Sequence, residues 1–445
     1  MAIRLPASPA RPLLTKLIKQ ALEAVEAGGA IRRAVRKHGH RLTVGRRPYD
    51  LRRYKRIVVI GAGKAAAAMA RAMEWLLGTR LDTGLVIVKY GHAVRTRQIL
   101  VEEAGHPVPD AAGLKAARRL ERLTSSLSAR DLLIVLLSGG ASSLMPAPVQ
   151  GITFNDEQRV TQQLLKSGAS IREINTVRKH LSQLKGGRLA ASTDATIVTL
   201  ILSDVIGDEV SAIASGPTVS DPTTFHDAVE CLKRYRLWSG APERVRTHLD
   251  RGRRGLVADT PKPGAALFRR AQHHLIGNNG LAVAAAAQAA RKARLNTFVH
   301  RPALTGEASL AGARFGAMAR RILDQGKPMC RPCCVIAGGE TTVRVKGRGI
   351  GGRAQEFALA AATEIAGLKQ VWVAALGTDG TDGPTKAAGA VVDGETVGRA
   401  RRLGVDIDRA LKGNNTYPAL KKLRAHITTG PTNTNVNDLY LLLVL

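Results

Sequence analysis

Three hydrophobic stretches of this chain each end on a glycine-rich turn that carries charge: residues 58–72, 199–218 and 371–385. In α/β proteins, ligands bind at the carboxyl ends of strands, where glycine lets the backbone approach a phosphate and the next helix offers N–H groups. The first turn brings a lysine, and the other two bring aspartates. A cation for phosphate and carboxylates for a divalent metal are the components of phosphoryl transfer, so the pattern predicts a kinase-type enzyme.

Length and composition predict a two-domain α/β protein. The 445 residues are too many for one ordinary domain. Hydrophobic residues make up 44% of the chain but aromatic residues only 3%, which is typical of aliphatic parallel sheets covered by helices. No apolar run approaches the roughly 20 residues that a membrane helix needs, so we expect a soluble protein without a membrane partner.

The cysteine content indicates a reducing compartment. Four cysteines, three of them within residues 330–334, are too few and too clustered for a disulfide framework. The cluster lacks a second ligand pair, which favours a strand-edge group over a zinc site. We therefore expect a cytoplasmic protein.

The formal net charge of +32 raises the question of nucleic-acid binding, because lysine and arginine contacts to phosphate dominate such affinity. However, the basic residues are spread along the chain, aromatic residues are scarce, and no finger, RNP or basic-zipper pattern occurs. These observations argue against a nucleic-acid partner and favour a basic surface that steers small anionic substrates. The composition leaves a homo-oligomer open.

Strand and helix signals alternate from Arg56 onward, as in βαβ units. Helical segments are expected over about 156–191. Segment 239–264 is polar and rich in Gly, Pro and Arg, and is the best linker candidate. A second α/β unit is expected to begin at the HHLIG stretch, residues 273–277.

Two glycine turns follow buried strands in the first half of the chain. Lys64 lies in a G-x-G-K-A-A motif that includes Gly61 and Gly63. This is neither a Walker loop nor a complete dinucleotide motif, and exposure to water and anion binding are about equally favoured for the lysine. Gly139 and Gly140 come next, and their amides are suited to an anion nest. Ser142 and Ser143 then stand at an expected helix N-cap, which favours capping over reactivity.

Residues 174–190 read as one helix, with Ile174, Val177, Leu181 and Leu184 on an apolar stripe. Arg178, Ser182 and Lys185 fall beside that stripe on one polar face. A solvated basic face is the favoured interpretation, and His180 reads as a surface imidazole.

Carboxylates follow two further strands. Asp204 comes directly after a strand, which suits magnesium binding or proton abstraction from a hydroxyl. Asp379 and Asp382 follow another strand, where turn formation and metal binding are about equally favoured. Arg353 lies where a glycine loop meets a helix, and its guanidinium can bind carboxylate or phosphate bidentately.

The chain resembles the glycerate 2-kinases, whose C-terminal part carries the MOFRL module. The matching strings run in family order from about residue 15 to the C-terminus: GAGKAA, EAGHPVPD, SGGASSL, INTVRKHLSQLKGGRLA, LILSDVIGD, SGPTVSDPTTF, GGETTV, GGRAQE, GTDGTDGPT and TGPTNTNVNDL. The sequence departs from the usual family pattern at Ala354, at Asn433 and at Asn414-Asn415. Ala354 removes a polar side chain that the usual pattern has at this position, so this departure bears on the fit of the substrate and not on the class of reaction.

The resemblance implies an N-terminal Rossmann-like α/β/α domain over 10–255, with a largely parallel sheet. It implies a smaller C-terminal α/β domain over 265–445, with a mixed sheet and the MOFRL module at about 330–440. The expected activity is ATP- and magnesium-dependent phosphorylation of the C2 hydroxyl of D-glycerate, in a cleft between the domains.

The positions that match the family's functional residues are Lys64, Asp204, Arg353 and Asp379. We expect Lys64 to hold anionic oxygens and Arg353 to clamp the glycerate carboxylate or the moving phosphoryl group. Asp204 and Asp379 would face each other across the cleft, one binding magnesium and one acting on the hydroxyl, and the sequence leaves open which does which. Substrate or nucleotide binding is assigned to Gly61, Gly63, Gly139, Gly140, Ser142, Arg178 and Lys185.

An alternative reading is an NAD(P)H-dependent hydroxypyruvate reductase, a name also given to members of this family. A dinucleotide site needs an acidic residue after the second strand to hold the ribose hydroxyls. That strand ends in Lys89 instead. A lysine suits the 2′-phosphate of NADP, so the alternative is weakened but stays open.

Overall fold

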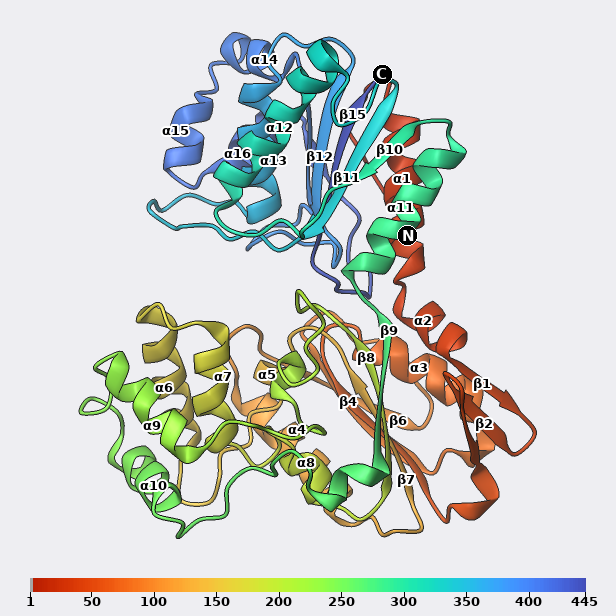
Figure 1. The fold of residues 1–445 in the computed structure, drawn as a ribbon, viewed down its shortest axis with the longest axis vertical. Coiled ribbons are helices and arrows are strands. Elements are labelled where there is room, and N and C mark those ends of the chain that lie inside the picture. Colours follow the sequence, from red (N-terminus) through yellow and green to blue (C-terminus); the bar gives the residue numbers. More distant parts are fainter. Residues whose placement is uncertain (1–2) are drawn as a thin grey trace. The chain divides into compact units, whose positions relative to one another are not determined.

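The computed structural model describes residues 3–445. Contacts divide the chain into two compact units. One unit is continuous, from Ala27 to Ile276, and we call it the inserted unit. The other combines the residues up to Glu26 with Gly277–Leu445, and we call it the discontinuous unit (Figure 1).

The inserted unit contains most of the predicted strand and helix alternation. Its helices are α2 (Ala27–Ala34), α3 (Ala66–Leu77), α4 (Ala111–Ser125), α5 (Ala141–Leu144), α6 (Phe154–Lys166), α7 (Ile171–His180), α8 (Arg188–Ala191), α9 (Phe225–Arg234) and α10 (Glu243–Arg253), with 3-10 turns η1 (Leu51–Arg53), η2 (Gly78–Arg80), η3 (Ile213–Ser215) and η4 (Ala266–Arg270). Its strands are β1 (Val35–His38), β2 (Arg41–Val44), β3 (Arg47–Asp50), β4 (Ile57–Ala62), β5 (Thr83–Lys89), β6 (Ile99–Ala104), β7 (Leu132–Leu137), β8 (Thr196–Leu202) and β9 (Ala271–Gly277).

The main sheet of the inserted unit has the strand order β6-β5-β4-β7-β8-β9. Numbered from β4, this is the Rossmann order 3-2-1-4-5-6. The pairs β4–β5, β5–β6, β4–β7 and β7–β8 are parallel. Strands β4 and β7 are buried at every position, as expected for a parallel sheet covered on both faces. The predicted Rossmann-like, largely parallel sheet is confirmed.

The inserted unit also carries a three-stranded antiparallel sheet, in the order β1-β2-β3, and a group of helices. Helices α6, α7, α9 and α10 share a second apolar core. The linker prediction for 239–264 is wrong, because α10 occupies this segment and buries Val245 and Leu249 in that core. Two apolar residues one helical turn apart are enough to dock a helix that is otherwise polar.

The discontinuous unit is a second α/β unit. Its helices are α1 (Arg11–Ala24), α11 (Asn279–Lys292), α12 (Ala308–Gln325), α13 (Arg353–Glu364), α14 (Thr396–Arg402), α15 (Ile407–Lys412) and α16 (Thr416–Lys422). Its strands are β10 (Asn296–Val299), β11 (Cys333–Gly339), β12 (Val371–Gly377), β13 (Gly389–Asp393), β14 (His426–Ile427) and β15 (Asp438–Val444).

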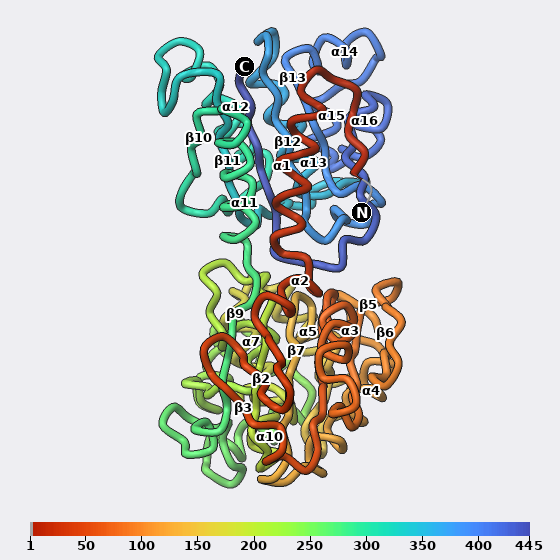
Figure 2. The backbone as a smooth tube through the Cα atoms, turned by 90° about the vertical axis from the view of Figure 1, so that its right-hand side faces the viewer, coloured from red at the N-terminus to blue at the C-terminus, as the bar shows by residue number. Residues whose placement is uncertain are grey.

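Its sheet has the order β10-β11-β15-β12-β13-β14 and is mixed, as predicted. Strand β15 runs antiparallel to both β11 and β12 and lies between them. Helices α12 and α13 cover one face and contribute to the main core of the unit, while α1 and α11 pack together on the other face (Figures 1 and 2).

The boundaries of the two units differ from those expected at 10–255 and 265–445. Helix α1 belongs to the discontinuous unit because it packs against α11, about 250 residues later in the chain. The HHLIG stretch does not begin the second unit. It is part of β9, which adds the last strand to the sheet of the inserted unit.

Within residues 3–445, no helix is long and apolar enough to cross a membrane. All four cysteines are free thiols. Cys333 and Cys334 lie buried in β11, and Cys330 is exposed just before it.

Candidate active site

The carboxyl ends of β4 and β7 lie side by side in the inserted unit. Strand β4 pairs with β5 on one side and with β7 on the other, so the order of the sheet reverses between β4 and β7. Open α/β sheets bind ligands at such a reversal, at the carboxyl ends of the strands. Lys64 follows β4 by two residues, and Gly139 follows β7 by two. The fold therefore brings together two of the predicted turns.

These two turns are hydrogen-bonded to each other. The Lys64 amide donates to the Gly139 carbonyl at 2.9 Å, and the Ala65 amide donates to Ser138 Oγ at 3.0 Å. Gly63 has a φ of +127° and approaches Ser138 so closely that a Cβ atom would lie 2.2 Å from Ser138 Oγ. Only glycine fits there. His92 adds a third support, with Nδ1 3.1 Å from the Lys64 carbonyl oxygen. The backbone around Lys64 is thus fixed by contacts with three residues: Ser138, Gly139 and His92.

The turn after β7 is anchored by hydroxyl groups. Gly140, with a φ of +85°, takes the N-cap position of α5, so Ser142 and Ser143 lie inside this short helix and not at its cap. Ser142 Oγ lies 2.8 Å from Ser215 Oγ, which donates to Asn175 Oδ1 at 3.0 Å. Ser215 itself has a φ of +60°, an uncommon conformation for a residue with a side chain. Such strained backbone occurs preferentially at functional sites.

Asp204 lies at the same edge of the sheet. It follows β8, the neighbour of β7, by two residues. Ser203 forms a tight turn here, with its hydroxyl bonded to both the amide and the carbonyl of Val205. Because carboxyl ends of parallel strands share one edge, this turn presents Asp204 beside the glycine turns after β4 and β7.

The solvated basic face predicted for 174–190 is wrong. Helix α7 ends at His180, so Leu181 and Leu184 lie beyond it in a turn. Lys185 is 1% exposed, with Nζ 3.0 Å from the Met145 carbonyl oxygen and 3.7 Å from Glu157. Burial lowers the pKa of Lys185 to about 8, although the Glu157 carboxylate acts in the opposite direction. Arg178, near the same carboxylate, has its pKa lowered by burial.

His180 is also inside the protein and not at its surface. Its Nδ1 lies 2.7 Å from the Thr176 carbonyl oxygen and its Nε2 lies 2.9 Å from Asp259. Lys179 pairs with the buried Asp221 at 3.2 Å. Asp259 follows α10 and Asp221 precedes α9, so these two contacts fasten α7 to the segments on either side of α9 and α10. The local sequence does not reveal this structural role.

A second polar edge lies in the discontinuous unit. Strand register places Gly339 at the end of β11, Asp438 at the start of β15 and Gly377 at the end of β12 in one row. Glu340 directly follows β11, and Asp379 follows β12 by two residues. Arg353, the first residue of α13, points into this row.

The Arg353 guanidinium is bound by two carboxylates. Its Nε and Nη2 donate to the two oxygens of Asp438 at 2.7 and 3.0 Å, and its Nη1 donates to Glu340 at 2.5 Å. Burial raises the pKa of Asp438 to about 7, while the Arg353 charge lowers it. Tyr440 completes the cluster by donating to Asp438 at 3.0 Å. A guanidinium has five N–H donors, so two remain beyond these three bonds for an anionic ligand.

Asp379 and Asp382 have different surroundings. Asp382 caps α13: its Oδ1 accepts from the Ala354 amide, and its Oδ2 accepts from the amide and side chain of Gln355. Asp379 instead forms a local turn with a residue two positions later: its Oδ1 accepts from the amide and hydroxyl of Thr381 at 3.0 and 3.1 Å. The helix cap accounts for Asp382 as a structural residue, and Asp379 stays the candidate for chemistry.

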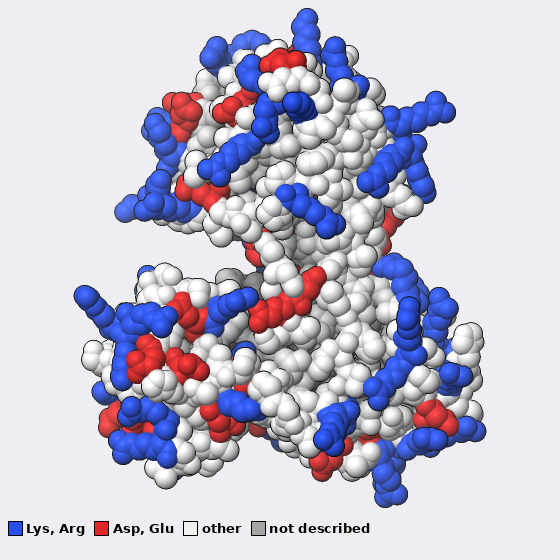
Figure 3. Space-filling model, in the orientation of Figure 1, with Lys and Arg blue, Asp and Glu red and all other residues white. Residues whose placement is uncertain are grey.

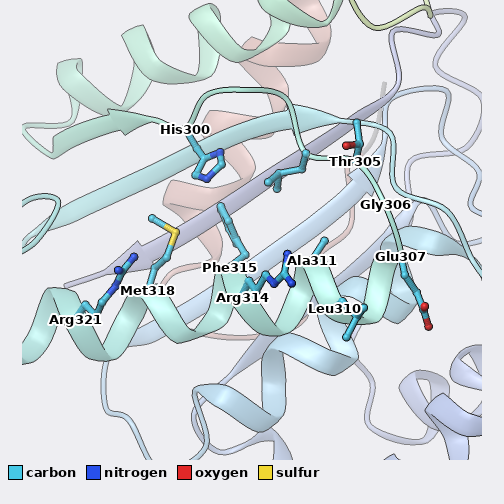
Figure 4. Close-up of a pocket in the computed structure, with 11 residues that line it drawn as sticks. His300, Thr305, Gly306, Glu307, Leu310, Ala311, Arg314, Phe315, Met318 and Arg321 are labelled. Carbon is cyan, nitrogen blue, oxygen red and sulfur yellow. The ribbon is translucent and has the colours of Figure 1, made fainter.

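The discontinuous unit also has a pocket of about 490 Å³ between residues 300–307 and α12 (Figure 4). His300 faces Phe315 and Met318 across it, and Arg314 and Arg321 flank it. The Glu340 amide donates to the Leu304 carbonyl at 2.9 Å, so the pocket wall is joined to the residue that binds Arg353. An apolar floor with basic flanks suits a small anion that has an apolar part. No sequence motif pointed to this pocket.

Comparison with known proteins identifies the family. Residues 13–250 match the domain of unknown function DUF4147, and residues 333–438 match the MOFRL family. The chain is 40% identical to a glycerate 2-kinase of Pyrococcus horikoshii over 435 residues, which cover 98% of this chain and 97% of the relative. The chain belongs to the glycerate 2-kinase family.

Solved structures and a differently named relative complete the comparison. A crystal structure of glycerate kinase from Thermotoga maritima matches with a TM-score of 0.84 and 39% identity, over 98% of this chain and 99% of that one. A crystal structure from Pyrococcus horikoshii matches with a TM-score of 0.82 and 40% identity, over 99% of each chain. A protein of Agrobacterium vitis with the name putative hydroxypyruvate reductase is 42% identical over 392 residues, 87% of each chain.

The departures from the usual glycerate 2-kinase pattern fit their surroundings. Asn433 has a φ of +56°, and asparagine tolerates this conformation better than most residues. Asn414 donates to Glu356 at 3.3 Å and accepts from the Lys346 and Gly347 amides. An acidic residue at 414 could not donate to Glu356. Ala354 is fully buried in the core, where its methyl group needs no polar partner.

The donor set fits magnesium that arrives with nucleotide phosphates better than magnesium held in a protein cage. Within residues 3–445, no three His, Cys, Asp or Glu side chains cluster in a way that could hold a metal. Magnesium commonly binds through one or two carboxylates together with substrate phosphates and water. Asp204 and Asp379, one at each edge, stay the predicted carboxylates for that mode.

Sequence reasoning missed several members of the site in this glycerate 2-kinase relative. Ser138 and His92 hold the Lys64 turn, and Glu340, Asp438 and Tyr440 surround Arg353. Asp438 could have been predicted from the sequence, because it lies in the TGPTNTNVNDL string and begins the last hydrophobic stretch. A carboxylate that opens an otherwise apolar strand therefore indicates a candidate site residue.

Proposed function

We propose that this protein transfers the γ-phosphoryl group of ATP to the C2 hydroxyl of D-glycerate, giving 2-phosphoglycerate and ADP. The observation that carries this proposal is the pair of interlocked glycine turns after β4 and β7, with Lys64 at the point where the strand order reverses. The family relationship supports the same reaction, since the relatives from Pyrococcus and Thermotoga are named as kinases of glycerate.

In this proposal, the inserted unit binds phosphate. The amides of the turns that contain Gly61, Gly63, Gly139 and Gly140 surround anionic oxygens, and Ser142 lies beside them. Lys64 places a positive charge on the phosphate whose bond breaks. Such fixed charges act where negative charge develops in the transition state. Buried Lys185 supports this turn through the Met145 carbonyl, and Arg178 acts with it, so both contribute by positioning.

The discontinuous unit supplies the groups that orient glycerate. Arg353 is held in place by Asp438 and Glu340, which leaves its remaining donors for the glycerate carboxylate or the transferring phosphoryl group. Of Asp204 and Asp379, one would accept the C2 hydroxyl proton and the other would hold magnesium. Magnesium carried with ATP would neutralise charge on the phosphate oxygens.

A second candidate is reduction of hydroxypyruvate with NAD(P)H, favoured by the Agrobacterium vitis relative of that name. The residue that would contact the ribose weighs against it, because Lys89 ends β5 where a dinucleotide fold normally has an acidic residue. A reducing cytoplasmic location is part of the proposal and is consistent with four free thiols.

A coupled assay distinguishes the candidates. Purified protein is supplied with D-glycerate, ATP and magnesium, and the products 2- and 3-phosphoglycerate are resolved. A parallel reaction contains hydroxypyruvate with NADH or NADPH. Predominant 2-phosphoglycerate supports the proposal. Predominant 3-phosphoglycerate contradicts the proposed position of transfer. Oxidation of NADH or NADPH in the hydroxypyruvate reaction, with no ATP consumed in the glycerate reaction, would mean that the protein is a reductase and not a kinase.

A further inference from the structure

One segment of the inserted unit has a locally high density of basic residues, although most of the 67 Lys and Arg residues lie elsewhere in the chain. Residues 32–56 contain eleven Lys and Arg residues but only one acidic residue, Asp50. This segment covers the end of α2, the small sheet of β1, β2 and β3 with its turns, η1 and the three residues before β4. Figure 3 shows blue side chains gathered over the part of the inserted unit where Figure 1 labels β1 and β2. Steering of glycerate and ATP does not require so local a concentration.

The register of the small sheet places basic groups on its outer face. Arg36 and Lys37 lie opposite Thr43 and Leu42, and His38 lies opposite Arg41. Alternation along the strands turns Val35, Leu42 and Val44 inward, where they are buried, and turns Arg36, His38 and Arg41 outward, where they are exposed. Exposed arginines also occupy the β2–β3 turn, the start of β3 and η1, at Arg46, Arg47, Arg52 and Arg53. The outer face is therefore both basic and rich in guanidinium groups.

An exposed tryptophan lies on the helix next to this sheet. Helix α3 contacts β1, and its Trp75 is 77% exposed. Arg71, one helical turn earlier, is exposed on the same side of α3. Figure 2 shows the β2–β3 hairpin and α3 beside each other, with β5 and β6 beyond α3. A large aromatic ring in water next to many arginines is an arrangement that a soluble enzyme does not need for stability.

A second basic segment lies on the other side of α3. Glu74, next to Trp75 in sequence, accepts hydrogen bonds from the amides of Arg97, Gln98 and Ile99 at 2.5–3.0 Å. These bonds hold residues 93–101 against the helix, where they line a shallow hollow of about 490 Å³ that includes Arg95 and Arg97. Both arginines are exposed. Helix α3, which carries Trp75, thus contacts both the small basic sheet and the segment that contains Arg95 and Arg97.

We propose that this basic face, formed by β1–β3, η1, α3 and residues 93–98, binds single-stranded nucleic acid without sequence preference. Arginine forks match phosphate oxygens bidentately, and a flat aromatic side chain stacks on any unpaired base. An anionic membrane is the competing partner for a basic surface with tryptophan. It is disfavoured because membrane-surface elements present a whole apolar face to lipid, whereas none of the large hydrophobic residues of β1–β3 and η1 is exposed.

The test measures fluorescence anisotropy of labelled oligo(dT) and oligo(rU), each about 16 nucleotides long, at about 50 and 200 mM salt. We expect binding that weakens at least about tenfold between these salt concentrations. A charge-reversal pair on the outer face, Arg36→Glu with Arg41→Glu, should weaken binding by roughly tenfold or more. The matched control is Arg401→Glu with Arg402→Glu, an exposed pair on α14, which should leave binding close to wild type.

Trp75→Ala separates stacking from charge. Its affinity for the oligonucleotides should fall by about tenfold while the salt dependence stays unchanged, because the ring contributes stacking and no charge. Oligonucleotide binding should quench the intrinsic tryptophan fluorescence of the wild type. The Trp75→Ala variant, which keeps the two other tryptophans, should show less quenching. None of these residues belongs to the phosphoryl-transfer site, so glycerate kinase activity should be retained and reports that each variant is folded.

Three results would overturn the proposal. The first is absence of oligonucleotide binding at the lower salt concentration. The second is equal loss of affinity in the Arg36/Arg41 and Arg401/Arg402 pairs, which would mean a general charge effect of the whole chain. The third is binding to phosphatidylserine vesicles in sedimentation without binding to oligonucleotides, which would assign the basic face to a membrane surface.

Discussion

The two polar edges of this protein are built in opposite ways. In the inserted unit, the edge consists mainly of backbone groups and hydroxyls, brought together because glycine allows the turns after β4 and β7 to touch. In the discontinuous unit, the edge consists of charged side chains, with Arg353 bound between Asp438 and Glu340. The first edge suits a ligand that is itself highly charged, such as a phosphate chain.

The difference follows from strand direction. The four pairings among strands β4 to β8 are parallel, so several carboxyl ends and helix starts meet at one edge and provide amides there. In the discontinuous unit, antiparallel β15 lies between β11 and β12, so its amino end shares the edge with their carboxyl ends. That arrangement puts a strand-opening carboxylate, Asp438, next to the arginine. A mixed sheet therefore favours side-chain chemistry at its edge.

The largest effect should come from Lys64→Ala. If the inserted unit depends on backbone amides plus the Lys64 charge, removal of that charge should lower kcat by about 10²–10³-fold, as for loss of a preorganised group in an active site. The fold should survive, because the backbone bonds of residue 64 do not need its side chain. Steady-state kinetics with circular dichroism measures both. The control is Lys115→Ala, an exposed site on α4. A near-normal kcat in folded Lys64→Ala would mean that Lys64 has no role in catalysis.

Asp379→Asn tests the discontinuous edge. The asparagine oxygen can still accept from the Thr381 amide and hydroxyl, so the turn should persist and the melting temperature should stay close to wild type. Loss of the negative charge should reduce activity by about tenfold or more if the carboxylate binds magnesium or the substrate hydroxyl. Activity is measured across a magnesium titration. Wild-type activity at every magnesium concentration would leave Asp204 as the chief metal candidate.

Asp382→Asn should show the reverse pattern. Its carboxylate accepts from two α13 amides and the Gln355 side chain, and an amide group offers one oxygen where the carboxylate offers two. We expect a loss of about 1–3 kcal/mol in unfolding free energy and a milder loss of activity than in Asp379→Asn. Urea denaturation measures the stability. Asp408→Asn, exposed on α15, serves as control, and the prediction fails if the two variants are equally stable.

The smallest effect concerns Lys185 and pH. Burial lowers its pKa to about 8 from an ordinary 10.5, so between these values the unfolded chain binds more protons than the folded protein. Stability therefore rises with pH in this window. The unfolding free energy of wild type, measured against Lys185→Met at each pH, should rise between pH 8 and 10.5 by at most about 3 kcal/mol. A difference that is independent of pH would contradict the buried, partly deprotonated lysine.

The sequence predicted the parts of this fold that depend on local patterns. Buried strands such as β4 and β7 are continuous apolar runs, and Lys64 and Arg353 stand at glycine turns where strand or loop meets helix. These signals lie within a few residues of one another. They were sufficient for the α/β class, the Rossmann-like sheet and the family.

The parts that depend on distant partners were not predictable in this way. Lys185 and His180 look like surface residues in sequence, because Glu157 and Asp259, which compensate their polarity, lie 28 and 79 residues away. In the same way, α10 reads as a linker until the helices that cover its two apolar residues are known. Polar side chains in a core are recognisable only through their partners.

The division of the discontinuous unit has a consequence for synthesis on the ribosome. Helix α1 emerges first, yet its packing partner α11 is translated only after the whole inserted unit. Its buried face, which includes Leu14, Leu17 and Ile18, is therefore without that partner for about 250 residues of elongation. The inserted unit has its complete sheet once β9 has left the exit tunnel and can fold before the other unit closes. The order of translation thus allows the inserted unit to fold before the sequence of the discontinuous unit is complete.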